Sequence, residues 1–250
     1  TKLITNYARV TGLRVDKVNV HQHFFPLPFE RYITIQSGSG QGAKNYDLFP
    51  EVLRRLEPIL RANKVGIVHL GGKDDPALPG VHDLRGKTSI LQAHYLIART
   101  LLHLGNDSWM AHCAGWNHRP LVALYGSTSV ANHGPYWYDT ANTVLLESHR
   151  FGGVPTYSAQ EQPKTINLIP PEKVVGAVLR LLGIQETITE ESRFYGLLYP
   201  QLAFDLVPDS VPPPTFLPEV VFTVRMDHLH DAGKLVELLQ TGRRVHIITK

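Results

Sequence analysis

Residues 101–126, LLHLGNDSWMAHCAGWNHRPLVALYG, decide the fold class of this chain. The run LLHLG (101–105) is short and apolar, as in a buried strand, and PLVALYG (120–126) has the same character and stops at a glycine. The segment between them has the composition of a helix. A strand, a helix and a second strand in succession form a crossover between parallel strands. The stretch therefore predicts one strand–helix–strand unit of an α/β protein.

The same alternation continues on both sides of this unit. Further strands are predicted at 31–36, 64–72, 142–147 and 164–169, and helices at 49–62, 88–100 and 170–183. The predicted fold is an α/β, open, doubly wound and mostly parallel sheet of the Rossmann type. Ligands of such sheets bind beyond the carboxyl ends of the strands, so the loops that follow the strands are the first place to look for a site.

Composition divides the chain further. Residues 1–30, with Pro26 and Pro28, are interpreted as a linker at the end of a missing N-terminal domain, and 31–185 as the main domain. Residues 186–218 are predicted to form a proline-rich connector, since they contain LVPDSVPPPTFLPE. Residues 219–250 follow a strand–helix–strand pattern and end on VHIITK. We expect this unit to be truncated and the chain to be part of a longer polypeptide.

The overall composition excludes several classes of protein. The formal net charge is +3 and there is no run of five basic residues, which argues against nucleic-acid binding. No apolar run reaches the roughly 18 residues that cross a bilayer, and no signal-peptide pattern opens the chain. The single cysteine excludes an internal disulfide and suits a reducing compartment. These features predict a cytoplasmic protein.

The helix at the centre of the opening stretch begins with Asp107 and Ser108 and carries His112 and Cys113. Their spacing does not converge on a metal ion, and Cys113 points about 100° away from His112 on a helix, so neither a zinc site nor a cysteine nucleophile is favoured. A helix start that follows a strand attracts anions, and Ser108 and His112 are four residues apart. Spacing alone leaves two interpretations open: an anion site, or a capping Asp107 with a surface histidine.

The segment NDSWMAHCAGWNHRPLVALYGSTS (106–129) resembles the donor-site segment of the family 9 glycosyltransferases, the ADP-heptose–lipopolysaccharide heptosyltransferases. That family has an Asp-Thr-Gly-x-x-His helix start, then a Pro, an apolar strand and a Gly-x-Thr loop. Asp107, His112, Pro120, Gly126 and Thr128 match it. Ser108 replaces the family's Thr, whereas Trp109 replaces its Gly, which puts the shape of the pocket in doubt.

The resemblance runs from about Tyr7 to Gly183 and implies a GT-B donor domain, the half of the enzyme that holds the nucleotide sugar. It implies an ADP-sugar or other nucleoside-diphosphate sugar as donor, no cofactor and no required metal. It also implies a glycan or glycolipid acceptor held by a missing domain, a role in lipopolysaccharide or surface-glycan synthesis, and peripheral contact with the inner membrane through the acceptor lipid. The catalytic base belongs to the missing domain and is not assignable here. The residues implied in nucleotide-sugar binding are Ser37, Ser39, Lys44, Lys87, Thr88, Asp107, Ser108, Trp109, His112, Gly126 and Thr128.

Two alternatives stay open from the sequence. Trp109 could fill the pocket, which would leave a non-catalytic α/β interaction module with a degenerate donor site. A metal-dependent hydrolase is the third interpretation. It would rest on His21 and His23, which resemble the first strand of metal-dependent amidohydrolases, and on the cluster MDHLHD (226–231), although a linker with chance histidines and an Asp-rich helix start explain these residues more simply. Such a hydrolase needs further ligands at later strand ends, and no such series is visible.

Overall fold

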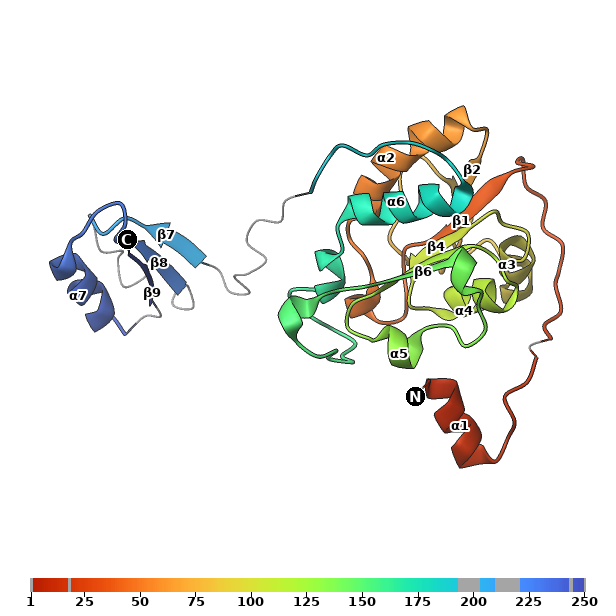
Figure 1. Ribbon diagram of the computed structural model, residues 1–250, viewed down its shortest axis with the longest axis horizontal. Coiled ribbons are helices and arrows are strands. Elements are labelled where there is room, and N and C mark those ends of the chain that lie inside the picture. Colours follow the sequence, from red (N-terminus) through yellow and green to blue (C-terminus); the bar gives the residue numbers. More distant parts are fainter. Residues whose placement is uncertain (1, 18, 193–202, 210–220, 243–244, 250) are drawn as a thin grey trace. The chain divides into compact units, whose positions relative to one another are not determined.

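The computed structural model describes residues 2–17, 19–192, 203–209, 221–242 and 245–249. The chain divides into two compact units, residues 1–193 and 194–250. Each unit has its own sheet (Figure 1). The predicted domain boundaries at 31, 186 and 219 stay predictions, and each unit is described by itself.

The larger unit is built on a six-stranded parallel sheet, which confirms the predicted fold class. Its strands run in the order β3-β2-β1-β4-β5-β6. Their bounds are Tyr32–Gln36 (β1), Gly66–His69 (β2), His82–Asp83 (β3), His103–Asn106 (β4), Leu121–Tyr125 (β5) and Thr143–Glu147 (β6). From β1 the chain winds outward to β3, then returns to place β4 on the other side of β1. The winding direction therefore reverses between β1 and β4, and a crevice forms at such a point.

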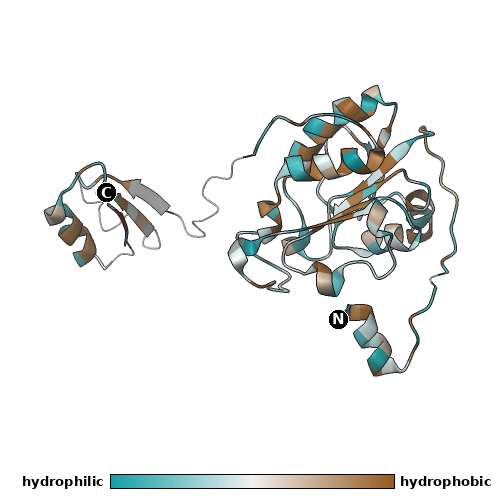
Figure 2. Ribbon diagram, in the orientation of Figure 1, coloured by the Kyte–Doolittle hydropathy of each residue, from teal (hydrophilic) through white to brown (hydrophobic). Residues whose placement is uncertain are grey.

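Helices cover both faces of this sheet. α2 (Phe49–Ala62) and α6 (Pro171–Leu182) pack on one face, and α3 (Ile90–Ile97) and α4 (Trp109–Trp116) on the other (Figure 1). Successive strand residues point to opposite faces, so Val122 contacts the core under α2 and α6, and Ala123 the core under α3 and α4. The central strands are mainly hydrophobic, whereas the covering helices carry both hydrophobic and hydrophilic residues (Figure 2). This pattern is the one expected of a sheet covered on both faces.

Two regions of the larger unit differ from the sequence interpretation. The predicted linker at 1–30 contains α1 (Leu3–Thr11), a helix with no buried residue. The predicted strand at 164–169 is wrong, because Thr165–Leu168 form a 3-10 helix. The Glu161 carboxylate accepts hydrogen bonds from the Thr165 amide and hydroxyl, and Ile166 and Leu168 are buried within this turn. The apolar residues therefore reach the core without pairing in the sheet. The remaining short helices are α5 (Val130–His133) and the 3-10 turns Gly42–Lys44, Thr140–Asn142 and Arg150–Gly152.

The smaller unit confirms the predicted strand–helix–strand pattern and adds a strand. β8 (Val221–Arg225), α7 (Ala232–Gln240) and β9 (Val245–Ile248) follow one another, and β7 (Ala203–Leu206) pairs in parallel with β8. Phe222, Val224 and Leu238 form its core. β7 lies inside the segment predicted as a connector, and residues 193–202 and 210–218 of that segment lie outside the described residues.

Candidate functional site

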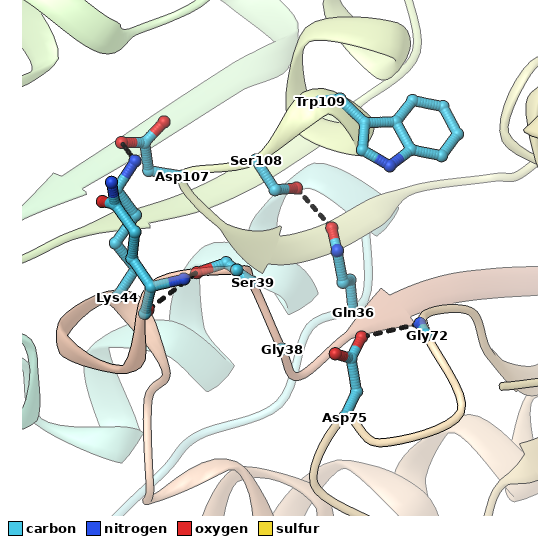
Figure 3. Close-up of a pocket in the computed structure, with 11 residues that line it drawn as sticks. Gln36, Gly38, Ser39, Lys44, Gly72, Asp75, Asp107, Ser108 and Trp109 are labelled. Atoms are coloured by element: carbon cyan, nitrogen blue, oxygen red, sulfur yellow. Dashed lines mark hydrogen bonds and ion pairs between the residues drawn. The ribbon is translucent and has the colours of Figure 1, made fainter. Parts of the chain in front are cut away.

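A cavity of about 360 Å³ opens where the winding direction of the sheet reverses (Figure 3). Three chain segments line it: the loop after β1, the loop after β2 and the start of α4 after β4. The lining residues are Gln36, Gly38, Ser39, Gly40, Gln41, Lys44, Gly72, Asp75, Asp107, Ser108 and Trp109. Its position agrees with the sequence expectation that the site lies at the carboxyl ends of the strands.

An ion pair joins the loop after β1 to the loop after β4. Lys44 Nζ lies 2.8 Å from Asp107 Oδ2, and the two side chains are only 14% and 5% exposed. Thr128, in the loop after β5, donates from Oγ1 to the same Asp107 oxygen at 2.7 Å. Lys44 is thus held at the cavity by Asp107.

The first turn of α4 is capped by Ser108 and not by Asp107. Ser108 Oγ accepts from the Met110 amide at 3.2 Å and donates to Gln36 Oε1 across the cavity (Figure 3). The first amides of a helix have no intrahelical acceptor and carry the positive end of its dipole. The cavity therefore offers a lysine ammonium and a helix start to an anion. Trp109 projects on the side away from Lys44 and is 39% exposed, so it does not fill the space.

Asp75 packs against the backbone of several glycines, across the cavity from Lys44 (Figure 3). Its Oδ2 accepts from the Gly72 amide at 2.9 Å, and a Cβ added to Gly38 would come within 2.2 Å of its Cγ. A Cβ added to Gly71, whose φ is +157°, would likewise come within 2.3 Å of Asp75 Oδ2. A carboxylate only accepts hydrogen bonds. Asp75 therefore suits hydroxyl groups of a ligand and repels a phosphate.

His112 is not at this cavity. It lines a second cavity of about 330 Å³ with Lys2, Trp116 and His133, under α1. The rule that residues four apart share a helix face fails here because Ser108 is extended (φ −153°, ψ 173°) and precedes the helix. Burial lowers the pKa of His112, and the Asp107 carboxylate opposes that effect. Ser108 and His112 therefore line different cavities, and the role of His112 in ligand binding stays a prediction.

Ser37 is buried next to the cavity and does not line it. It donates to the Pro76 carbonyl at 2.6 Å and lies 2.9 Å from His69 Nε2, while His69 Nδ1 is 3.9 Å from Asp83. These three side chains follow the order of a hydrolytic triad. However, the single Ser37 proton is already donated to Pro76, so His69 must donate from Nε2 and cannot act as a base toward Ser37.

Three other predicted residues lie off the cavity wall. Lys87 is exposed and donates to the Asp83 carbonyl, and Thr88 is half-buried just before α3. Gly126 contacts the backbone of Ile166, where a Cβ would come within 2.5 Å of its amide nitrogen. Gly126 is thus required by packing, and Thr128 acts on the cavity through Asp107. Ser39, Lys44, Asp107, Ser108 and Trp109 are the predicted residues that the structure brings together.

Cys113 and the histidine clusters form no reactive or metal-binding group. Cys113 is buried in the core under α3 and α4, which raises the pKa of its thiol to about 12. Across the described residues, no three His, Cys, Asp or Glu side chains come together in a way that could hold a metal ion. Within the same residues, no helix is long and apolar enough to cross a membrane.

The sequence did not point to Gln36 and Gln41, which line the cavity, or to Arg150, which donates to the carbonyls of Gly126 and Thr128. Gln36 is the last residue of β1, and a polar residue ending a buried strand beside the reversal point is a signal that could have found it. Arg150 lies 43 positions after Asp107 in the chain, and no local pattern links the two.

Comparisons with known proteins identify the family of this chain. A model of glycosyltransferase family 9 (heptosyltransferase) matches residues 7–151. A search of curated proteins finds no match. Among solved structures, a family 9 glycosyl transferase from Veillonella parvula is 20% identical over 71% of this chain and 50% of its own, with a TM-score of 0.46. E. coli ADP-heptose lps heptosyltransferase II gives 20% identity, the same coverage and a TM-score of 0.47.

A further solved structure reaches a TM-score of 0.50. It is the dodecameric iron-containing heptosyltransferase TibC in complex with ADP-D-beta-D-heptose, from E. coli; it is 16% identical and covers 68% of this chain and 50% of its own. This chain spans about half the length of these structures. At such identities the likeness shows the fold alone. The family model, however, covers more than half of the sequence, and this chain belongs to glycosyltransferase family 9.

Proposed function

We propose that this chain binds the nucleoside-diphosphate sugar of a glycosyltransferase, with an ADP-sugar such as ADP-heptose as the donor. The observation that carries the proposal is the placement of Lys44 beside the start of α4, at the point where the sheet reverses. Family membership and the ADP-heptose bound to TibC support the same donor class.

The chemistry of transfer explains why these groups suit the role. As the sugar leaves, negative charge develops on the diphosphate, and fixed donors stabilise it where it forms. An ammonium has three donors, and Asp107 takes one, so Lys44 keeps others for a phosphate oxygen. The amides at the start of α4 add uncharged donors, and Asp75 accepts hydrogen bonds from the ribose hydroxyls. None of these groups needs a metal ion for this role.

The acceptor and the catalytic base belong, in this proposal, to residues outside this sequence. The whole reaction would then be a glycosyl transfer in lipopolysaccharide or surface-glycan synthesis, at the cytoplasmic side of the membrane that carries the acceptor lipid. Support comes from the family and from the coverage of only about half of each similar structure.

One observation favours the interaction-module alternative. The cavity side chains include two carboxylates, Asp75 and Asp107, but one lysine, so their charges sum to −1. A site with this balance holds a diphosphate only if backbone amides supply the remaining donors.

Isothermal titration of the complete 250-residue chain with ADP, UDP and GDP distinguishes the donor-site proposal from the interaction module. The donor-site proposal predicts saturable binding of at least ADP, with a dissociation constant in the micromolar to low millimolar range, that inorganic phosphate alone does not reproduce. No heat of binding with any of the three nucleotides at millimolar concentration would favour the module.

A further inference from the structure

Arg150 donates hydrogen bonds to the loop that follows β5. It lies in the 3-10 turn Arg150–Gly152, after the edge strand β6, and its side chain is 8% exposed. Its Nε donates to the Gly126 carbonyl at 2.6 Å and its Nη2 to the Thr128 carbonyl at 2.5 Å. Its Nη1 donates to Glu147 at 2.8 Å. One guanidinium therefore fixes both ends of the three-residue loop 126–128.

Loop 126–128 contacts Asp107, one of the residues that line the cavity. Thr128 donates from its hydroxyl to Asp107, and the same Asp107 oxygen pairs with Lys44. A continuous chain of polar contacts thus runs from Arg150 through Thr128 and Asp107 to the lysine at the cavity. Arg150 does not line the cavity itself.

The backbone of Arg150 supports a specific role over general packing. Its φ is +46°, a left-handed conformation that L residues other than Asn and Asp rarely adopt. Such a conformation persists where the surroundings determine it. The planar guanidinium supplies donors in several directions at once, whereas a lysine ammonium acts as a point charge and cannot span two carbonyls and a carboxylate in this geometry.

We infer that Arg150 is a positioning residue of the donor site: it holds loop 126–128 so that Thr128 orients Asp107, and Asp107 in turn orients Lys44. The inference rests on the proposed function for its effect on ligand binding. It is tested by two readouts, of which one does not need a ligand.

The first readout is ADP affinity by titration of the complete chain carrying Arg150→Ala, Arg150→Lys or Thr128→Val. We expect each change to weaken ADP binding about tenfold, because each removes hydrogen bonds that hold Asp107 and Lys44 in place, and a factor of ten is the effect of losing about one such bond. In the Thr128→Val background, Arg150→Ala should cause little further loss, because both act on the same carboxylate. Arg180→Ala, an exposed arginine on α6, is the matched control and should bind as the unaltered chain does.

The second readout is amide hydrogen exchange. The Tyr157 amide donates to the Ser127 carbonyl at 2.8 Å and so reports on loop 126–128 itself. The Asp107 amide donates to the Leu124 carbonyl of β5 at 3.1 Å and so reports on the position of Asp107 beside that loop. Arg150→Ala should speed exchange at these amides while α6 keeps its protection, and Arg180→Ala should leave them unchanged.

The outcomes separate this inference from the proposed function. If the unaltered chain binds no nucleotide, the proposed function fails, and the exchange experiment alone decides whether Arg150 orders the loop. If the chain binds ADP but Arg150→Ala binds equally well, or if the losses from Arg150→Ala and Thr128→Val simply add, the positioning role is overturned. Unchanged exchange at Tyr157 and Asp107 would also overturn it.

Discussion

Replacement of Lys44 by methionine tests the candidate site most directly, because Met keeps the unbranched apolar part of the side chain and removes its charge. The change leaves Asp107, which is 5% exposed, without its ion-pair partner. Breaking a buried ion pair costs about 3–5 kcal/mol. Lys44 is 14% exposed and Thr128 still donates to Asp107, so we expect a smaller loss of about 2–3 kcal/mol.

The measurements are thermal unfolding and titration with ADP. For a unit of this size, 1 kcal/mol corresponds to about 2–4 °C in Tm, so the expected fall is about 4–12 °C. ADP affinity should fall about ten- to a hundredfold, because charge-assisted hydrogen bonds are worth roughly 1.5–3 kcal/mol. Because the pair is buried, the loss of stability should be measurable alongside the loss of affinity.

Two further variants control this experiment. Lys173→Met alters an exposed lysine on α6 and should change neither quantity. Adding Asp107→Asn to Lys44→Met removes the unpaired charge and should restore part of the stability but none of the affinity. A Tm that falls while ADP affinity stays the same would make Lys44 a structural residue only. Unchanged Tm and affinity together would refute both the ion pair and the donor site.

Three other predictions address neighbouring features. Ser108→Ala removes the cap of α4 and should lower stability by about 1 kcal/mol in urea unfolding, whereas Ser108→Thr should not. Trp109→Gly restores the residue found in the family and should tighten ADP binding, with a loss of helix stability up to about 1 kcal/mol; global unfolding of this variant would contradict its exposed position. Burial lowers the pKa of His69 to about 4 and that of His103 to about 3. Because these values lie below the unfolded value near 6.5, the unfolded state takes up protons first. Stability should therefore fall as pH drops below about 6.5, by roughly 2 kcal/mol per histidine between pH 7 and pH 5. His69→Gln should lose the contribution of His69 to this dependence, roughly 2 kcal/mol, and equal slopes in the two proteins would rule out that contribution.

The fold was predictable because each of its signals is local. Short apolar runs that stop at glycine or a polar residue mark β1, β2, β4 and β5, and the apolar spacing of 49–62 marks α2. The prediction failed at 164–169, where an equally apolar run is buried as a 3-10 turn under a carboxylate cap. Apolar content specifies burial, but the hydrogen-bond partner specifies the conformation.

The sequence by itself determined the α/β class, the edge of the sheet that carries the candidate site and five of the residues at that edge, because strand ends and helix starts are specified by adjacent residues. The tertiary structure decided what those residues contact. Only the tertiary structure shows that Lys44 pairs with Asp107, that Asp75 packs against Gly38 and that His112 lines a different cavity. These outcomes depend on the order of strands in the sheet and on where α4 begins. Both are set by the packing of segments far apart in the chain, whose contacts leave no periodic or local trace in the sequence.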